Sequence, residues 1–337
     1  MRSDYKIDSE NKWIPDGFHF LGPTASTKRR QLLEKLCDFF SEHGYSEVIP
    51  PSFDFTSSFI NHLSKSERDS ILKARDLQGR EISPGIDLTI QVVKGMAGFL
   101  QKKQNHNVFY RGTTIKDNYK SNTDRREVMQ VGAEVIGSSD AKTFAMMLQQ
   151  IDGICKQFGL SEKVTLVLGH VRVFSSLAKA LYLSRKEKIY LSSLLYAKNY
   201  KEIQSFLQNC QGESEVKDLL LQTLLEFDSQ VIVAEITKVS KKYQLGLEKV
   251  VSGLSEIGVL LTERLHSIDL CVDFSLLRDL DYYTGFVFHG YTDRIPYPIF
   301  TGGAYDHLYE KFSGVEKDAC GFALNLDLFE EMIEMEI

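Results

Sequence analysis

The sequence has few cysteines, and they follow no pairing or metal-binding pattern. There are five, an odd number, and none belongs to a CxxC pair: Cys37, Cys155, Cys210, Cys271 and Cys320. Disulfide frameworks and zinc sites need cysteines in pairs at fixed spacings, so neither is predicted. The eight histidines show no ligand spacing either, and we predict no metal site. Isolated thiols are typical of a reducing compartment, which favours a cytoplasmic location.

Long apolar runs and an excess of positive charge are also missing. No run approaches the roughly 18 to 20 residues that span a bilayer, and the N-terminal MRSDYKIDSENKW has no apolar stretch after its charges, so neither a span nor an export signal is predicted. The 40 Lys and Arg residues are outnumbered by 46 Asp and Glu, which gives a formal charge of -6. Proteins that bind through phosphate contacts are usually basic, so nucleic acid is not an expected partner.

The common signatures of phosphate loops, nucleophile elbows and zinc proteases are absent from the sequence. It contains no GxGxxG, GxxxxGK[ST], GxSxG or HExxH motif, and it has no internal repeat. We therefore predict no cofactor. What is present is ordinary for a folded protein: 337 residues, 43% hydrophobic and 26% charged, which is enough to bury a large core.

The first and last parts of the chain mix helical and strand patterns. Apolar residues recur at helical spacing over 26–43, where Gly44 should end the helix, and over 86–100. Strand-like composition occurs at 45–49, 108–110, 126–136, 271–274, 285–291 and 319–326. The adjacent Gly302 and Gly303 predict a turn between the last two strands.

The middle of the chain is different in character. From about 174 to 265 it consists of amphipathic helical segments separated by polar breaks such as 211–214. Strand patterns on both sides of a helical block predict one sheet interrupted by an insertion. We expect an α+β fold in which 1–173 and 267–337 form the two parts of one core and 174–266 form a helical insertion.

The strand predicted over 126–136 carries a polar face. Period-two alternation places Gln130, Gly132 and Glu134 on one side and apolar residues on the other. Gln130 and Glu134 would lie roughly 13 Å apart, with bare backbone at Gly132 between them, so an amino acid could lie across the strand. The alternative is a solvated sheet face with a glycine bulge.

A second polar cluster lies near the C-terminus. The segment 278–283 brings together one guanidinium, two carboxylates and two phenols. The planar fork of Arg278 suits a carboxylate ligand, although a surface turn in which Arg278 pairs with Asp281 explains the pattern as well. Asp87 and Thr89 lie at the start of the helix predicted over 86–100, and taken alone they are explained by helix capping.

Taken in order, these segments resemble the catalytic core of histidyl-tRNA synthetases, which are class II aminoacyl-tRNA synthetases, over about 26–327. GYSEVIPP resembles class II motif 1, VFYRGTTI resembles motif 2, and LLRDLDYYTGFVF and TGGAYDHL resemble the histidine-recognition signatures. The resemblance implies an antiparallel sheet flanked by helices. It also implies a set of histidine-binding residues: Asp87, Thr89, Gln130, Glu134, Arg278, Tyr282 and Tyr283.

Three departures set the chain apart from the synthetases. Motif 2 keeps Arg111, which we predict as an anion-binding residue, but Thr113 replaces the acidic residue of that motif. Motif 3 should end in an acidic residue followed by an arginine that stacks on adenine, and the chain has Asp327 followed by Leu328. The sequence ends at Ile337, and we therefore expect no anticodon-binding domain.

This combination resembles the family of ATP phosphoribosyltransferase regulatory subunits, to which GHVRVF at 169–174 is also similar. The resemblance implies a non-catalytic chain that activates a short-form catalytic subunit in the first step of histidine biosynthesis and mediates feedback inhibition by L-histidine. It also implies a hetero-octamer, with a self-dimer through the motif 1 region. The alternative functions are a truncated synthetase-like enzyme that adenylates an amino acid, and a scaffold that binds no ligand.

Within that resemblance, each site residue has a hypothetical role. Arg278 binds the carboxylate of free histidine, and Asp87 and Gln130 bind its ammonium group. Glu134 and one of the two adjacent tyrosines pair with the imidazole nitrogens. A site that satisfies both ring nitrogens rejects analogues that would leave a buried partner unpaired.

Overall fold

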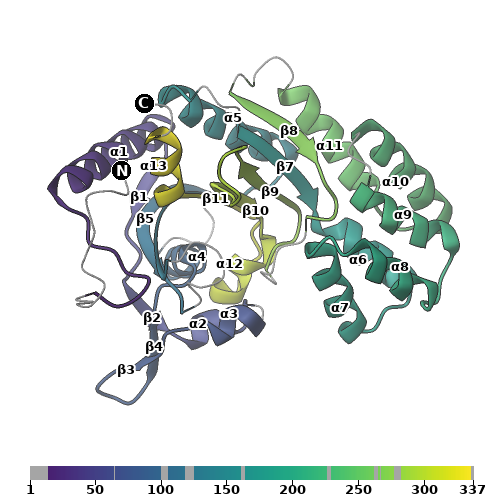
Figure 1. Cartoon of the computed structure of the whole chain (residues 1–337), viewed down its shortest axis with the longest axis horizontal. Helices are drawn as coiled ribbons and strands as arrows, with labels where there is room; N and C mark the ends of the chain where they lie inside the picture. Colours follow the sequence, from purple (N-terminus) through teal and green to yellow (C-terminus); the bar gives the residue numbers. More distant parts are fainter. Residues whose placement is uncertain are drawn as a thin grey trace.

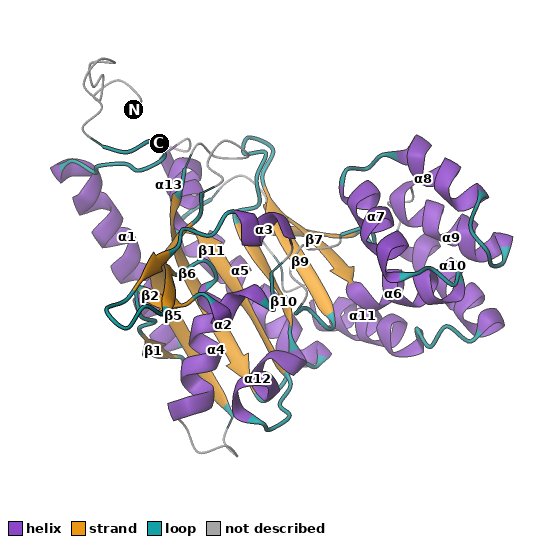
Figure 2. Cartoon of the chain, turned by 90° about the horizontal axis from the view of Figure 1, so that it is seen from below, coloured by secondary structure: helices purple, strands orange, loops and turns teal. Residues whose placement is uncertain are grey.

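The computed structural model describes residues 14–63, 65–99, 105–117, 125–160, 164–225, 229–261, 265, 267–276 and 282–334. These residues form a curved sheet with helices on both faces and a block of helices beside one edge (Figures 1 and 2). The α+β architecture predicted from the sequence is confirmed.

The main sheet has eight strands and is mostly antiparallel. Their order across the sheet is β1 (Ser46–Val48), β5 (His106–Ile115), β6 (Glu127–Ile136), β11 (Ala319–Asn325), β10 (Phe300–Ala304), β9 (Phe286–Tyr291), β7 (Val164–His170) and β8 (Ile268–Val272). The two edge pairs, β1 with β5 and β7 with β8, are parallel, and all pairs between them are antiparallel. Residues from the first half of the chain and from its C-terminal part thus meet in the centre of the sheet, where β6 pairs with β11.

One face of the sheet packs against α1 (Pro23–Glu42), α5 (Ala141–Gln157) and α13 (Leu326–Glu334). Val131, Ala133 and Val135 of β6 are buried in this core, which confirms the predicted alternation of that strand. The predicted end of the first helix is also confirmed, because Gly44 follows the cap residue with φ +81°, a conformation that favours glycine.

The opposite face packs against α4 (Leu88–Phe99) and α12 (Asp306–Ser313). Beside α4 lie the short helices α2 (Ser57–Ile60) and α3 (Lys65–Asp69) and a small sheet in the order β2 (Phe53–Phe55), β4 (Glu81–Pro84) and β3 (Ala74–Arg75). Tyr110 of β5 and Tyr305 beside α12 are buried among the apolar side chains of this face. Two phenols are therefore buried within the largely aliphatic packing of this face.

The helical block has its own apolar core. It contains α6 (Val171–Ala180), α7 (Arg185–Tyr196), α8 (Tyr200–Gln208), α9 (Ser214–Leu225), α10 (Ser229–Tyr243) and α11 (Glu248–Leu261). Val272 and Phe274, at the end of β8, enter this core, whereas Ile257 and Leu261 of α11 pack in the core of the sheet. The predicted helices are present, and their division from the sheet at 174 and 266 remains a proposal. No helix within the described ranges is both long and apolar enough to cross a membrane.

The turn predicted at Gly302 and Gly303 is wrong. Both residues belong to β10, between β9 and β11. A Cβ at Gly302 would lie 2.6 Å from the carbonyl oxygen of Gly321, and one at Gly303 would lie 2.6 Å from Cε1 of Tyr283. The glycines are needed because neighbouring groups approach the strand closely, a requirement that local sequence resembling a turn does not reveal.

Candidate functional site

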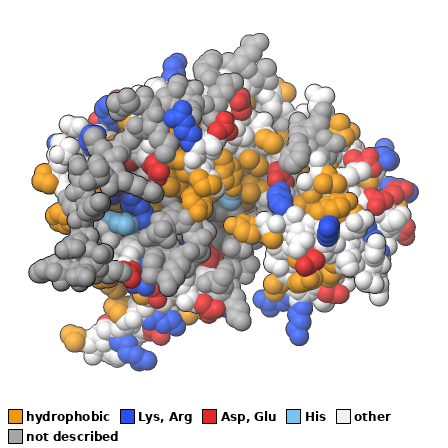
Figure 3. All heavy atoms as spheres, viewed as in Figure 1, with side chains coloured by type: hydrophobic (Ala, Val, Ile, Leu, Met, Phe, Trp, Pro, Cys, Tyr) orange, Lys and Arg blue, Asp and Glu red, His pale blue; other side chains and the backbone are white. Residues whose placement is uncertain are grey.

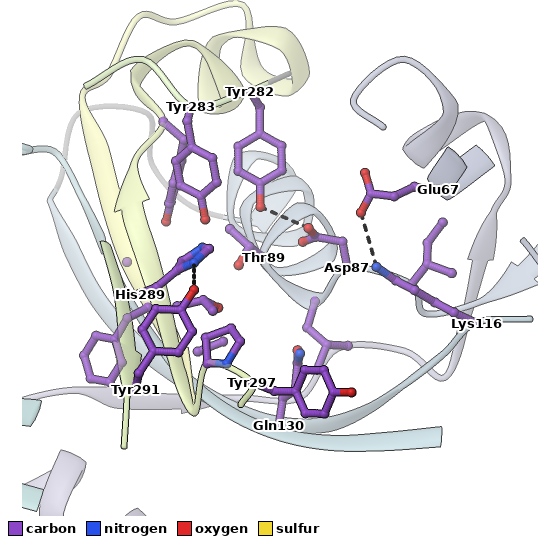
Figure 4. A pocket seen from close by; sticks show the side chains of 18 of the residues that line it. Glu67, Asp87, Thr89, Lys116, Gln130, Tyr282, Tyr283, His289, Tyr291 and Tyr297 are labelled. Carbon is purple, nitrogen blue, oxygen red and sulfur yellow. Dashed lines mark hydrogen bonds and ion pairs between the residues drawn. The ribbon is translucent and has the colours of Figure 1, made fainter. Parts of the chain in front are cut away.

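A pocket of about 410 Å³ lies on the face of the sheet that carries α4 and α12 (Figure 4). Five of the residues predicted from the sequence line it: Asp87, Thr89, Gln130, Tyr282 and Tyr283. They come from the start of α4, from β6 and from the segment before β9, which are far apart in the sequence. Arg278 lies outside the described residues, and so does Asp281.

Asp87 has both a structural and a pocket-facing role. Its Oδ1 accepts a hydrogen bond of 3.0 Å from the backbone N–H of Ile90, which caps the first turn of α4 as predicted. Its Oδ2 accepts a hydrogen bond of 3.0 Å from the hydroxyl of Tyr282. The carboxylate is thus held at the pocket wall by two donors, and capping and ligand binding do not exclude one another here.

Glu134 lies directly beneath the pocket and is fully buried. The hydroxyl of Thr89 donates to its Oε1 at 2.7 Å, and the hydroxyl of Tyr305 donates to its Oε2. Burial raises the pKa of Glu134 from its ordinary value of 4.5 to about 8, although these hydrogen bonds oppose the shift. A Cβ at Gly321, the residue paired with Glu134 on β11, would overlap this carboxylate. Only glycine at that position leaves room for the buried acid.

The backbone at Gly132 is not open to a ligand, so this part of the sequence-based prediction is wrong. Tyr110 lies opposite Gly132 on β5, and a Cβ at Gly132 would overlap its ring. Gln130 still lines the pocket, but Glu134 is covered by Thr89 and Tyr305 and does not. The polar face of β6 is filled by a side chain from the next strand, which the sequence of β6 alone cannot show.

The two adjacent tyrosines pack against each other and against neighbouring backbone. The rings of Tyr282 and Tyr283 have centroids 4.8 Å apart, and Tyr282 also meets Tyr305 edge-on at 6.0 Å. Tyr283 lies over Gly303, which explains the glycine there. Because the rings are packed on several sides, their hydroxyls keep defined positions at the pocket wall.

Arg111 lies outside the pocket, and its role in binding an anion stays a prediction. It follows Phe109 on the face of β5 that packs toward α1, and its Nε is 3.1 Å from Oε1 of the half-exposed Glu47. Lys116 lines the pocket instead, with its Nζ 3.3 Å from Oε1 of Glu67. Alternation from Tyr110 along the strand would have identified Lys116, since residues two, four and six apart share a face.

An aromatic wall of the pocket was not predicted. His289 and Tyr291 of β9 line it, and His289 Nδ1 is 2.9 Å from the hydroxyl of Tyr291. Tyr297 lines it from the connection between β9 and β10, and Tyr196 lines it from the end of α7. The alternation of FVFHGY places His289 and Tyr291 opposite the buried Phe286 and Phe288, so these two could have been found from the sequence. Nothing in the local sequence signals Tyr196.

The acidic residue of the motif 3 segment is held by the chain's own cations. The side chain of Asp327 is 4% exposed, and it accepts hydrogen bonds from Arg29 at 2.7 Å, from Arg125 at 2.9 Å and from the backbone N–H of Met129 at 3.0 Å. Leu328 is buried in the core of the sheet. At the position where a synthetase has its adenine-stacking arginine, this side chain points into apolar packing.

The chemistry of the pocket suits binding of a zwitterion. Asp87 supplies a negative charge, Gln130 has both a donor and an acceptor, and Lys116 is the one Lys or Arg among the described lining residues. Within the described ranges, no group of three or more His, Cys, Asp and Glu side chains could hold a metal ion. The pocket thus combines opposite charges with several phenols, above a buried acid.

Sequence comparison identifies relatives along nearly the whole chain. A sequence profile of the histidyl-tRNA synthetase family matches residues 17–328. The ATP phosphoribosyltransferase regulatory subunit of Leptospira interrogans is 44% identical over 336 residues, which cover 99% of this chain and 98% of the relative. The protein of the same description from Caldanaerobacter subterraneus is 28% identical, and the match covers 94% of this chain and 81% of the relative.

Solved structures have the same fold. A structure described as an ATP phosphoribosyltransferase regulatory subunit/histidyl-tRNA synthetase from Bacillus halodurans superposes with a TM-score of 0.79 at 21% identity. The match covers 95% of this chain and 82% of the Bacillus halodurans chain. A histidyl-tRNA synthetase from a Nostoc species has a TM-score of 0.75 at 16% identity, and the match covers 97% of this chain and 76% of the Nostoc chain. At these identities, the likeness concerns the fold.

Proposed function

The chain belongs to the family of ATP phosphoribosyltransferase regulatory subunits, and from this premise we propose that its pocket is the sensor site for free histidine. As a regulatory subunit it is non-catalytic, acts in histidine biosynthesis and works with the catalytic subunit of the same enzyme. One observation carries the proposal: residues from three distant segments line a single pocket of about 410 Å³ above the buried Glu134.

Asp87 and Gln130 bind the ammonium group of histidine in this proposal. Tyr282 and the helix N-terminus orient the Asp87 carboxylate, so little side-chain entropy is lost when an ammonium group binds. The side-chain amide of Gln130 has no hydrogen-bond partner among the described residues, and its oxygen can accept from the same ammonium. Both groups favour a ligand with a positive charge at this end.

Glu134 governs recognition of the imidazole ring. Tyr305 donates its hydroxyl hydrogen to Glu134 and lines the pocket, so its oxygen presents its acceptor side to a ligand. Thr89 also donates to Glu134, but its oxygen lies 3.4 Å from the hydroxyl of Tyr110 as well. An imidazole N–H meets such an acceptor, and Tyr283 pairs with the other ring nitrogen, because Tyr282 already donates to Asp87. An analogue without a ring N–H would leave a buried acceptor unpaired, which costs about 1 to 3 kcal/mol.

Arg278 remains the proposed partner of the histidine carboxylate. It lies outside the described residues, so its role rests on the resemblance of LLRDLDYYTGFVF to the histidine-recognition signature. Lys116 is a second cation at the pocket, where Glu67 already partly neutralises it.

Feedback follows if histidine binds the inactive form of the complex more tightly than the active form, by a typical coupling of about 1 to 3 kcal/mol. The proposal includes a hetero-octamer of regulatory and catalytic chains and a self-dimer through α1 and β1. Since coupling is reciprocal, phosphoribosyl pyrophosphate bound to the catalytic subunit should weaken histidine binding. Calorimetric titration of the complex with histidine, with and without phosphoribosyl pyrophosphate, checks this, and equal affinities would contradict it.

The binding proposal is tested by calorimetry on the chain alone and in complex with its catalytic subunit. Glu134→Ala should weaken histidine binding by about tenfold or more, because it removes the acid that orients Thr89 and Tyr305. Glu47→Ala is the matched control, since Glu47 is half-exposed and lies outside the pocket. If Glu134→Ala bound histidine as tightly as Glu47→Ala, the assignment of Glu134 would be wrong.

A further inference from the structure

The helical block contributes a residue to the pocket. Tyr196 is the last residue of α7, and it lines the pocket together with Tyr291 and Tyr297 from the sheet side. Its side chain is 62% exposed, and its hydroxyl has no hydrogen-bond partner among the described residues. In Figure 3, apolar side chains gather where the sheet-bearing part faces the helical block. A ligand in this pocket would therefore touch two parts of the chain that otherwise have separate cores.

The corner after Tyr196 is anchored to the sheet. Lys198 has φ +52°, the left-handed conformation that turns α7 into α8, and the backbone N–H groups of Lys198 and Asn199 donate to the last carbonyl groups of α7. The ammonium group of Lys198 is 2.7 Å from Oδ2 of Asp273 and also donates to the hydroxyl of Ser275. Asp273 in turn donates its backbone N–H to the carbonyl of Leu168 at 2.9 Å. The corner thus rests on the ends of β7 and β8.

The strands beneath this anchor lead directly to the aromatic wall of the pocket. Val167 of β7 pairs with Cys271 of β8 on one side and with His289 of β9 on the other. His289 lines the pocket and is hydrogen-bonded to Tyr291. The end of β8, where Lys198 is anchored, is therefore two strands away from the aromatic wall on β9, within one hydrogen-bonded sheet. This sheet fixes the position of Tyr196 relative to the aromatic wall.

We propose that Tyr196 is a histidine-contacting residue and that the anchored corner 196–199 transmits the effect of histidine binding to the helical block. The proposal rests on the proposed function, because it needs histidine in this pocket. Bound histidine covers the exposed ring of Tyr196 and gives its hydroxyl a polar partner. Lys198 touches no ligand; it is a positioning residue that keeps Tyr196 at the pocket. Helices α7 and α8 respond because the contact with bound histidine further stabilises their junction.

The first test is histidine affinity, measured by calorimetry on the complex with the catalytic subunit. Tyr196→Ala should weaken binding about three- to tenfold, as expected for loss of one aromatic contact. Lys198→Asn keeps a residue that tolerates φ above zero but removes the ammonium group, and should weaken binding at most about fivefold. Tyr200→Ala is the matched control, since Tyr200 lies on the same corner but does not line the pocket.

The second test is hydrogen exchange at the backbone amides of 197–199. Histidine should slow their exchange in the parent chain and in Tyr200→Ala, and should have no effect on them in Tyr196→Ala. Thr89→Val separates the two proposals. If Thr89→Val loses histidine binding while Tyr196→Ala binds normally, or if histidine leaves exchange at 197–199 unchanged, the role of Tyr196 is overturned and the histidine site stands. If the parent chain binds no histidine, with or without its partner, both proposals fall.

Discussion

Two buried carboxylates, one on β6 and one at the start of α13, are held in opposite ways. Asp327, just after β11, is bound by the guanidinium groups of Arg29 and Arg125. Glu134 of β6 is bound by hydroxyl groups, and no Lys or Arg among the described residues forms an ion pair with it. Residue pairing between β6 and β11 brings both regions into one layer of the sheet.

The two regions therefore differ in their capacity to respond to a ligand. In the motif 3 region, where a synthetase would hold its nucleotide, the chain neutralises its own acid and closes the charge network internally. In the pocket region, the acid is buried without a cation, and the groups around it present polar atoms to the cavity. A buried charge that is already paired stabilises the fold, whereas buried polar groups that can form further hydrogen bonds can select a ligand.

The largest effect on stability should come from removing the carboxylate of Asp327. Asp327→Ala removes the acceptor of Arg125 and of the Met129 backbone N–H, and leaves Arg29 with Glu330 alone. We expect the free energy of unfolding to fall by about 2 to 4 kcal/mol in urea denaturation. Glu34→Ala, which breaks the exposed pair with Arg30, should change it by about 0.5 kcal/mol or less. Equal effects of the two variants would show that the ion pairs of Asp327 stabilise the fold no more than an exposed pair does.

The next largest effect should come from closing the space around Glu134. Gly321→Ala places a Cβ on the Glu134 carboxylate and should lower the free energy of unfolding by about 1 to 3 kcal/mol, as overpacking does. Gly95→Ala in α4 has open space around it and should be neutral or stabilising by up to about 1 kcal/mol. Thermal and urea unfolding of the two variants measure this, and a neutral Gly321→Ala would argue against the tight burial of the acid.

A smaller effect should appear in the pH dependence of stability. The folded-state pKa of Glu134 is raised to about 8, so folding favours its protonated form, and stability should fall as pH rises from the unfolded value near 4.5 to about 8. Burial lowers the pKa of His170 to about 3, which removes stability as pH falls below about 6.5 and masks the lower part of this range. The effect of Glu134 should therefore be clearest between about pH 6.5 and 8.

Glu134→Gln isolates that effect. The glutamine side chain mimics the protonated acid, so the loss of about 1 to 2 kcal/mol expected of the parent chain between about pH 6.5 and 8 should disappear. Urea midpoints across that range measure it. Parallel pH profiles for the parent and Glu134→Gln would mean that Glu134 is ionised in the folded chain.

The smallest effect should come from Arg111. It is half-exposed and pairs with Glu47 outside the pocket, so Arg111→Ala should change the free energy of unfolding by less than about 1 kcal/mol. It should leave histidine affinity within about twofold of the parent, whereas Lys116→Ala, which alters the pocket wall, should change affinity measurably. A large loss of histidine binding in Arg111→Ala would bring that residue back into the site.

Local patterns predicted much of the framework and part of the site. Alternation correctly placed Val131, Ala133 and Val135 in the core, and the glycine signal at Gly44 correctly ended the first helix. Asp87 was also predicted as a helix cap. Each of these depends on residues a few positions apart along one element, where periodicity is decided by backbone geometry. Strand β7 and helix α5 were not predicted, and neither was the role of Tyr305 in binding Glu134.

Sequence patterns were enough to predict the alternation of core and polar residues, the helical character of the middle block and the family to which the chain belongs. Tertiary structure alone decided what fills the space between elements: Tyr110 over Gly132, Tyr305 on Glu134, and the reach of Tyr196 from the helical block into the pocket. The reason is physical. Periodicity assigns a side chain to a face, but what meets it there depends on the register and packing of segments that are distant in the sequence.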